Sequence, residues 1–263
     1  MEQNLCVSYE NVKPKLKAFD LIFFKGKGFT GDLIRFGQWI TSVNKDYNIG
    51  TLEFSHVGLI LTSDLLQGVK NVLPNELYIW ESTLNDRSGI GVADINGNYF
   101  KGVQLRNLDA VVSNYNKNQV NKAVRKGKLL KDSCISIAQL NEKSRECIDK
   151  KYDDLKITFP RIFKKYQGVH YDSQPLDLLG AMLKCFRWGD ITEELNEVLG
   201  SKDWLFCSEL VTVVFKEVGI FPETCMPPFV VPTDLLGHDS DKIEDGGIPL
   251  VVNDPINLKI SDI

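Results

Sequence analysis

The sequence predicts an α+β protein in which antiparallel strands lie between the N-terminal elements and a helix that begins near Cys207. Short apolar runs bounded by turn residues recur in the first half of the chain, which is typical of strands. Apolar residues after Cys207 recur with helical spacing. No internal repeat and no low-complexity linker divides the 263 residues, so we expect a single domain spanning 1–263.

Composition and charge narrow the classes of function. Hydrophobic residues make up 43% of the chain and charged residues 25%, as in an ordinary soluble globular protein. The formal net charge of −4 gives no reason to expect nucleic-acid binding. No segment approaches the roughly 20 apolar residues of a membrane span, and the first residues lack the apolar core of a secretory signal. We therefore expect a cytoplasmic protein, while a basic run at 122–131 leaves peripheral contact with a membrane open.

The first half of the chain is expected to consist of strands joined by turns. The apolar run that ends at Phe24 is followed by Lys-Gly-Lys-Gly, which favours a strand and then a turn. Gly, Asn and Pro residues between Thr62 and Leu77 favour a loop. We predict strands at 20–24, 52–62, 77–82 and 102–105, a loop at 63–75 and a short helix at 30–42.

The second half is expected to be mostly helical. We predict helix and exposed connection over 107–131, a strand at 134–140, helical structure over 142–166 that is broken at Pro160, and helices at 175–186 and 191–199. The proline-rich tail, 223–263, is expected to hold one strand at 248–252.

Cys207 stands at the predicted start of an amphipathic helix that ends before Gly219. The apolar positions that define this helix are Leu210, Val211, Val214, Phe215 and Val218. A thiol at a helix N-terminus experiences the positive end of the helix dipole, which favours the thiolate. Backbone N–H groups at the same place can stabilise an oxyanion. Cys207 is therefore a candidate nucleophile.

His56 and Glu81 are the candidate base and the candidate orienting acid. On a strand, His56 shares a face with Gly58, which leaves room for another group beside the imidazole. Glu81 ends an otherwise apolar face of the next strand and needs a partner. If these strands pair antiparallel across the 63–75 loop, Glu81 can lie near His56. Imidazole can take the thiol proton, and a carboxylate can orient the imidazole.

Each of these residue types also has a commoner structural role. A cysteine that opens a helix more often packs in the core, a histidine in a strand is more often a satisfied structural residue, and a glutamate at a strand end more often lies at the surface. The six cysteines form no C-x-x-C pair and have no clustered histidines, so neither a zinc site nor a cofactor is expected. A disulfide framework is not expected either.

Several motifs occur in a fixed order from about residue 17 to 237. They are Asp20-Leu-Ile-Phe-Phe-Lys-Gly-Lys-Gly28, Phe54-Ser-His56-Val-Gly-Leu-Ile60, Glu81, Gly168-x-x-Tyr171-Asp172, Phe206-Cys207-Ser-Glu-Leu-Val211 and Pro232-x-Asp234-Leu235. This set resembles the circularly permuted papain-like family, whose bacterial members are called YiiX-like and which is related to the NlpC-type cell-wall amidases. The chain departs from the family at Phe19, where members usually have Gly.

The resemblance implies a fold and a set of site residues. The fold would be an antiparallel sheet or small barrel packed against the cysteine helix, with helical insertions at about 106–166 and 175–204. Cys207 would be the nucleophile, His56 the base and Glu81 the polar third member. Tyr171 would contact the oxyanion or the substrate.

The implied activity is that of a thiol hydrolase acting through an acyl-enzyme on an amide bond in a peptide or peptide-like substrate. A lipid ester hydrolase or acyltransferase is an alternative, because related permuted enzymes are associated with both kinds of bond. A catalytically idle structural protein is a further alternative, including one that assembles in virions, since relatives occur in bacteria and in large DNA viruses. A protein partner that binds through the insertions is also left open.

Overall fold

The structure is a computed structural model, and it describes residues 6–25, 54–83, 91–125, 135–170, 205–223, 225, 230, 232, 234–236 and 251–259. The helices expected at 30–42, 175–186 and 191–199 lie outside the described residues, and so does Tyr171.

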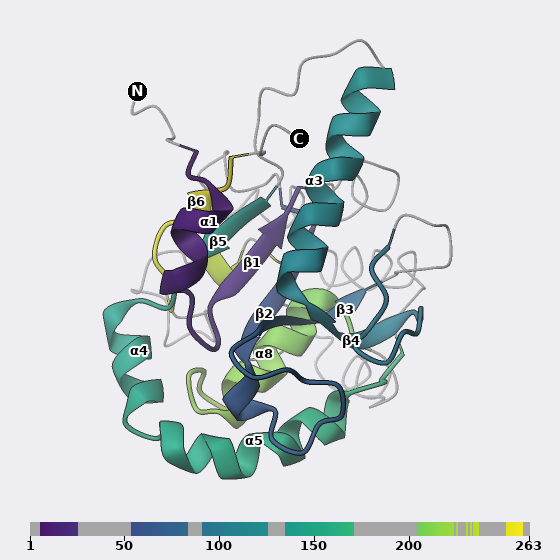
Figure 1. The fold of residues 1–263 in the computed structure, drawn as a ribbon. Coiled ribbons are helices and arrows are strands. Elements are labelled where there is room, and N and C mark those ends of the chain that lie inside the picture. Colours follow the sequence, from purple (N-terminus) through teal and green to yellow (C-terminus); the bar gives the residue numbers. More distant parts are fainter. Residues whose placement is uncertain are drawn as a thin grey trace, which may run out of the picture.

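The described strands form one open, six-stranded sheet (Figure 1). They are β1 (Leu21–Phe24), β2 (His56–Thr62), β3 (Leu77–Thr83), β4 (Gly102–Asn107), β5 (Ile135–Ala138) and β6 (Ile256–Asn257). Their order across the sheet is β4-β3-β2-β1-β5-β6, and every neighbouring pair is antiparallel. Sheet and helices occur together, so the predicted α+β class is confirmed.

Helices cover both faces of this sheet (Figure 1). The described helices are α1 (Tyr9–Val12), α3 (Leu108–Arg125), α4 (Glu142–Asp149), α5 (Tyr152–Tyr166) and α8 (Cys207–Glu217), with the 3-10 turns η1 (Lys13–Lys15), η3 (Ser63–Leu65) and η5 (Asp234–Leu236). None of the described helices is both long and apolar enough to cross a membrane.

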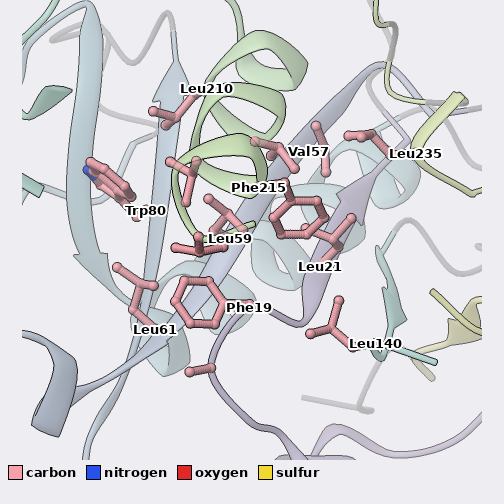
Figure 2. Close-up of a cluster of buried hydrophobic side chains, with 14 of the residues drawn as sticks. Phe19, Leu21, Val57, Leu59, Leu61, Trp80, Leu140, Leu210, Phe215 and Leu235 are labelled. Atoms are coloured by element: carbon pink, nitrogen blue, oxygen red, sulfur yellow. The ribbon is translucent and has the colours of Figure 1, made fainter. Parts of the chain in front are cut away.

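The face that packs on α8 and α5 holds the larger part of the core (Figure 2). Leu59 and Trp80 lie against Leu210 and Phe215 of α8, and all four side chains are inaccessible to solvent. Burying a side chain of this size contributes about 1.5–3 kcal/mol. The same face includes Phe159 of α5, whose ring lies edge-on to Trp80 at 5.8 Å. This packing fixes α8, and therefore Cys207, against β2 and β3.

The opposite face packs on α3. Ile22, Ile60 and Ile79 from three adjacent strands form a buried cluster with Leu108 and Val112 at the start of α3. The alternation of the two sets along each strand is the period of two expected for a sheet covered on both faces.

The helical region 142–166 breaks at a different place from the one predicted. The chain turns at Lys150 and Lys151, between α4 and α5, and α5 continues through Pro160. Proline removes one backbone hydrogen bond. Phe159 and Ile162, on either side of Pro160, are both buried in the core, and their packing keeps the helix continuous.

Most of the strand predicted at 248–252 lies outside the described residues, which here begin at Val251. Val252 makes a single bridge with Leu140, and the pairing continues later, where Ile256 of β6 faces Ile137 of β5. Val251 and Val252 are both buried in the core.

Two other boundaries matter for the site. β2 begins at His56 rather than at residue 52, and β4 extends to Asn107, two residues beyond the predicted end. Within the segment 106–166, predicted to be an insertion, β5 joins the sheet and α5 packs in the core.

Candidate active site

Cys207 is the first residue of α8, as the sequence predicted. The first hydrogen bond of the helix runs from the N–H of Leu210 to the carbonyl of Phe206, at 3.0 Å. The backbone N–H groups of Cys207 and Ser208 precede this bond, so they face the N-terminal end of the helix. Glu209 accepts a hydrogen bond from the N–H of Phe206 at 3.2 Å, which stabilises the first turn.

The start of α8 is held in place by contacts with distant segments. The hydroxyl of Ser82 at the end of β3 donates to the carbonyl of Leu205 at 2.5 Å, and the N–H of Leu205 donates to the carbonyl of His170 at 3.0 Å. The hydroxyl of Ser208, the second residue of α8, donates to the carbonyl of Val230, outside the helix, at 2.7 Å. These bonds position the buried thiol of Cys207 at one end of the sheet.

His56 is the first residue of β2, and the side chain of Cys207 is the neighbour that most raises the pKa of its imidazole. The ring also lies against Phe24, with 5.6 Å between centroids. Its Nε2 contacts Oε2 of Glu81, so Nδ1 is the ring nitrogen that the carboxylate leaves free. With 22% of its side chain exposed, His56 is accessible to solvent at its rim, whereas Glu81 is completely buried.

The close approach of Glu81 depends on Gly58. A Cβ atom at residue 58 would lie 2.7 Å from Cγ1 of Ile79 and 3.1 Å from Cβ of Glu81. The space that Gly58 was predicted to leave beside the imidazole is therefore present, and the side chains of Ile79 and Glu81 from β3 occupy it. The structure thus brings together three predicted site residues, Cys207, His56 and Glu81.

Arg106 is a fourth member of this cluster, and the sequence reasoning missed it. Its Nε donates to Oε1 of Glu81 at 2.9 Å, and its Nη2 contacts the same oxygen. Arg106 and Glu81 are both buried, so this is an internal ion pair. The signal was present in the alternation of β4, where the polar residues Gln104 and Arg106 alternate with the apolar residues Val103 and Leu105, but the predicted strand ended at residue 105.

The charges of this cluster control its ionisation. Burial by itself raises the pKa of Glu81, but the charge of Arg106 and the hydrogen bond from His56 outweigh burial and lower it to about 2. Burial by itself lowers the pKa of His56, but the interactions with Cys207 and then Glu81 outweigh burial and raise it to about 10. The arrangement therefore favours a carboxylate at Glu81 and an imidazolium at His56.

The other candidates are placed less centrally or not at all. Tyr171, the predicted oxyanion or substrate contact, lies outside the described residues. His170 is exposed, with its ring 5.5 Å from that of Phe100. Gln104 is fully buried near Arg106 on β4, and its side-chain oxygen accepts no hydrogen bond.

No group of metal-ligating side chains occurs in the part of the chain that the structure describes. The described cysteines Cys6, Cys147, Cys207 and Cys225 are all free thiols. A thiol, an imidazole, a carboxylate and a helix N-terminus in contact can carry out nucleophilic acyl transfer without a further group.

No protein-family model matches this chain, and no curated protein is significantly similar to it. The functional argument therefore depends on the geometry of the site and on the motifs in the sequence.

Proposed function

We propose that this chain is a thiol hydrolase with a circularly permuted papain-like fold, which cleaves an amide bond in a peptide or peptide-like substrate through an acyl-enzyme. The observation that carries the proposal is the bond between His56 and Glu81, together with the effect of Cys207, which raises the pKa of the same imidazole. The order along the chain, with the histidine strand before the cysteine helix, supports the permuted topology.

In the first step, the Cys207 thiolate attacks the carbonyl carbon of the substrate and forms an S–C bond. The backbone N–H groups of Cys207 and Ser208 are suited to stabilise the resulting oxyanion. As the C–N bond breaks, the His56 imidazolium gives its proton to the leaving nitrogen. The products of this step are a thioester on Cys207, a free amine and a neutral His56.

In the second step, neutral His56 takes a proton from a water molecule, which attacks the thioester carbon. The C–S bond breaks, the acid product leaves, and the thiolate–imidazolium pair is restored. Glu81 keeps the ring oriented throughout and stabilises its charged form. Cleavage of an ester, with an alcohol as the leaving group, would proceed by the same two steps. A lipid ester is therefore the alternative substrate that the experiments below distinguish from an amide.

The first prediction concerns the reactivity of Cys207. At neutral pH, iodoacetamide should modify Cys207 at least about tenfold faster than the exposed Cys6, because Cys207 is the proposed nucleophile and His56 the proposed base that activates it. Peptide mass spectrometry of the full chain would measure both rates. Cys225 provides the internal comparison, because burial raises the pKa of its thiol and should make it slow to react.

Panels of fluorogenic peptides and phospholipids would then identify the substrate class. Cys207→Ala should abolish turnover, and Cys225→Ala should retain it. Labelling of Cys207 no faster than that of Cys6 would contradict the proposal. If only phospholipids are turned over, the scissile bond is an ester rather than an amide. Fast labelling of Cys207 without turnover of any substrate in either panel would favour a catalytically inactive protein.

A further inference from the structure

Arg106 occupies the far end of the chain of contacts that begins at Cys207. Of the two carboxylate oxygens of Glu81, Arg106 binds Oε1, through Nε at 2.9 Å and through Nη2. The other carboxylate oxygen, Oε2, is the one that contacts His56. Two cations thus hold the two oxygens of one carboxylate, which fixes the carboxylate plane and the direction of Oε2. The third Arg106 nitrogen, Nη1, lies 3.4 Å from the carbonyl of Val92.

We propose that Arg106 is the positioning residue of the catalytic site, which keeps Glu81 ionised and directs its free oxygen at His56. The inference rests on the proposed thiol hydrolase function and adds a fourth residue to the triad. Arg106 touches neither the thiol nor the ring through any described contact, so its effect passes through Glu81.

The charge balance supports this role. With a thiolate, an imidazolium, a carboxylate and a guanidinium, the four groups sum to zero net charge. After acyl transfer, Cys207 and His56 are both neutral, and Glu81 and Arg106 still balance one another. The buried site therefore avoids an uncompensated charge before and after the reaction, which matters because an isolated buried charge is costly.

A second buried carboxylate in the same molecule, Asp20, allows a comparison, because it has one cationic partner instead of two. Asp20 is fully buried and pairs with Arg145, whose Nη2 lies 2.6 Å from Oδ1. Burial nevertheless raises the pKa of Asp20 against the charge of Arg145. Glu81 differs by having two cationic partners, and its pKa is lowered. Without Arg106, Glu81 would keep one cationic partner, as Asp20 does, and should bind a proton much more readily.

The experiment measures the rate of Cys207 alkylation by iodoacetamide against pH in the full-length chain. Arg106→Gln retains a hydrogen-bond donor but loses the charge. In this variant the acid limb of the rate profile should shift to higher pH by about one pH unit or more. The rate at alkaline pH should recover to within a few-fold of the wild type. Arg106→Lys, which keeps the charge, should restore the acid limb towards the wild-type position.

Arg145→Met is the matched control, because it also removes a buried arginine from a carboxylate, outside the site. It should leave the acid limb in place. A merely structural role of Arg106 would lower labelling equally at every pH. An unchanged acid limb in Arg106→Gln would overturn the inference and leave the proposed function standing, whereas slow labelling of Cys207 in the wild type would overturn the proposed function itself.

A measurement on the wild type covers the case in which Arg106→Gln does not fold. Carboxyl carbon NMR of glutamate-labelled protein, with the Glu81 signal assigned from Glu81→Gln, reports the ionisation of this one side chain. Glu81 should remain a carboxylate down to about pH 4. Uptake of a proton above about pH 5 would overturn the inference, because Arg106 would then not be holding the charge.

Discussion

At the scale of single residues, His56 shows how neighbours override burial. The pKa of this ring is raised to about 10 from an ordinary value of 6.5, although burial by itself lowers it. The protonated ring therefore stabilises the folded state fully below about pH 6.5, and this stabilisation is lost as the pH rises towards 10. Glu81 behaves in the opposite sense, because its pKa is lowered from 4.5 to about 2. Its contribution is present above about pH 4.5 and is lost as the pH falls towards 2.

These signs predict the pH dependence of a His56 variant. The free energy of unfolding of the wild type should exceed that of His56→Gln most at about pH 6, and the difference should shrink steadily towards pH 10. Urea unfolding at several pH values would measure it. His170→Gln is the control for the replacement of a histidine, because His170 is exposed and lies outside the cluster of His56, Glu81 and Arg106. A difference that grows with pH would contradict the imidazolium assignment.

At the scale of elements, the close approach of β2 and β3 beside the site depends on one missing side chain. A Cβ atom at residue 58 would lie 2.7 Å and 2.8 Å from Cγ1 and Cδ1 of Ile79. Contacts this short force neighbouring atoms to move. Since Glu81 follows Ile79 on the same face of β3, any shift of β3 changes the position of the carboxylate relative to His56.

The prediction at this scale concerns Gly58→Ala. It should lower the free energy of unfolding by about 1–3 kcal/mol and reduce the rate of Cys207 labelling at neutral pH. Ile79→Ala should cost about 2–5 kcal/mol by itself, since it opens a cavity. Because the alanine at residue 58 would occupy part of that cavity, the double variant should be more stable than the sum of the two losses implies, by about 0.5–3 kcal/mol. Additive losses would show that Ile79 does not limit the space at residue 58.

At this scale the sequence predicted most elements, and the exceptions have physical causes. The starts of β3 and α8 agree with the turn signals and the helical spacing that predicted them. Pro160 predicted a helix break that does not occur, because the packing of Phe159 and Ile162 outweighs one lost hydrogen bond. Arg106 was missed because its role depends on a partner in another strand, which local alternation does not identify.

At the scale of the whole molecule, Asp20 joins segments that lie far apart in the sequence. Its Oδ1 accepts from Arg145 of α4 at 2.6 Å and from the N–H of Leu140 after β5 at 3.0 Å. Arg145 also donates to the carbonyl of Ala18 at 2.9 Å. These bonds attach α4 and the end of β5 to the beginning of β1 (Figure 1). Asp20 is thus a structural carboxylate, at the opposite end of β1 from Phe24 and His56.

Removing this connection should reduce stability without changing the chemistry of the site. We expect Arg145→Met to lower the free energy of unfolding by about 3–5 kcal/mol at neutral pH, because it leaves a buried carboxylate without its cation. Urea unfolding would measure this. Asp20→Asn combined with Arg145→Met should cost less than Arg145→Met alone, since no buried charge remains. A double variant that is less stable than the single one would show that the hydrogen bonds of Asp20, rather than its charge, hold α4.

The sequence by itself determined the local features: the alternation of the strands, the start of a helix at Cys207, and the loop between β2 and β3. That these two strands pair, so that Glu81 lies beside His56, was a condition in the sequence analysis, and the structure meets it. The local features follow from periodicity and turn chemistry, which act over a few residues. Only the tertiary structure decided that β5 joins β1, that α5 runs through Pro160, and that Arg106 neutralises Glu81. Those outcomes depend on burial and on charges contributed by residues far apart in the chain, so no local pattern could specify them.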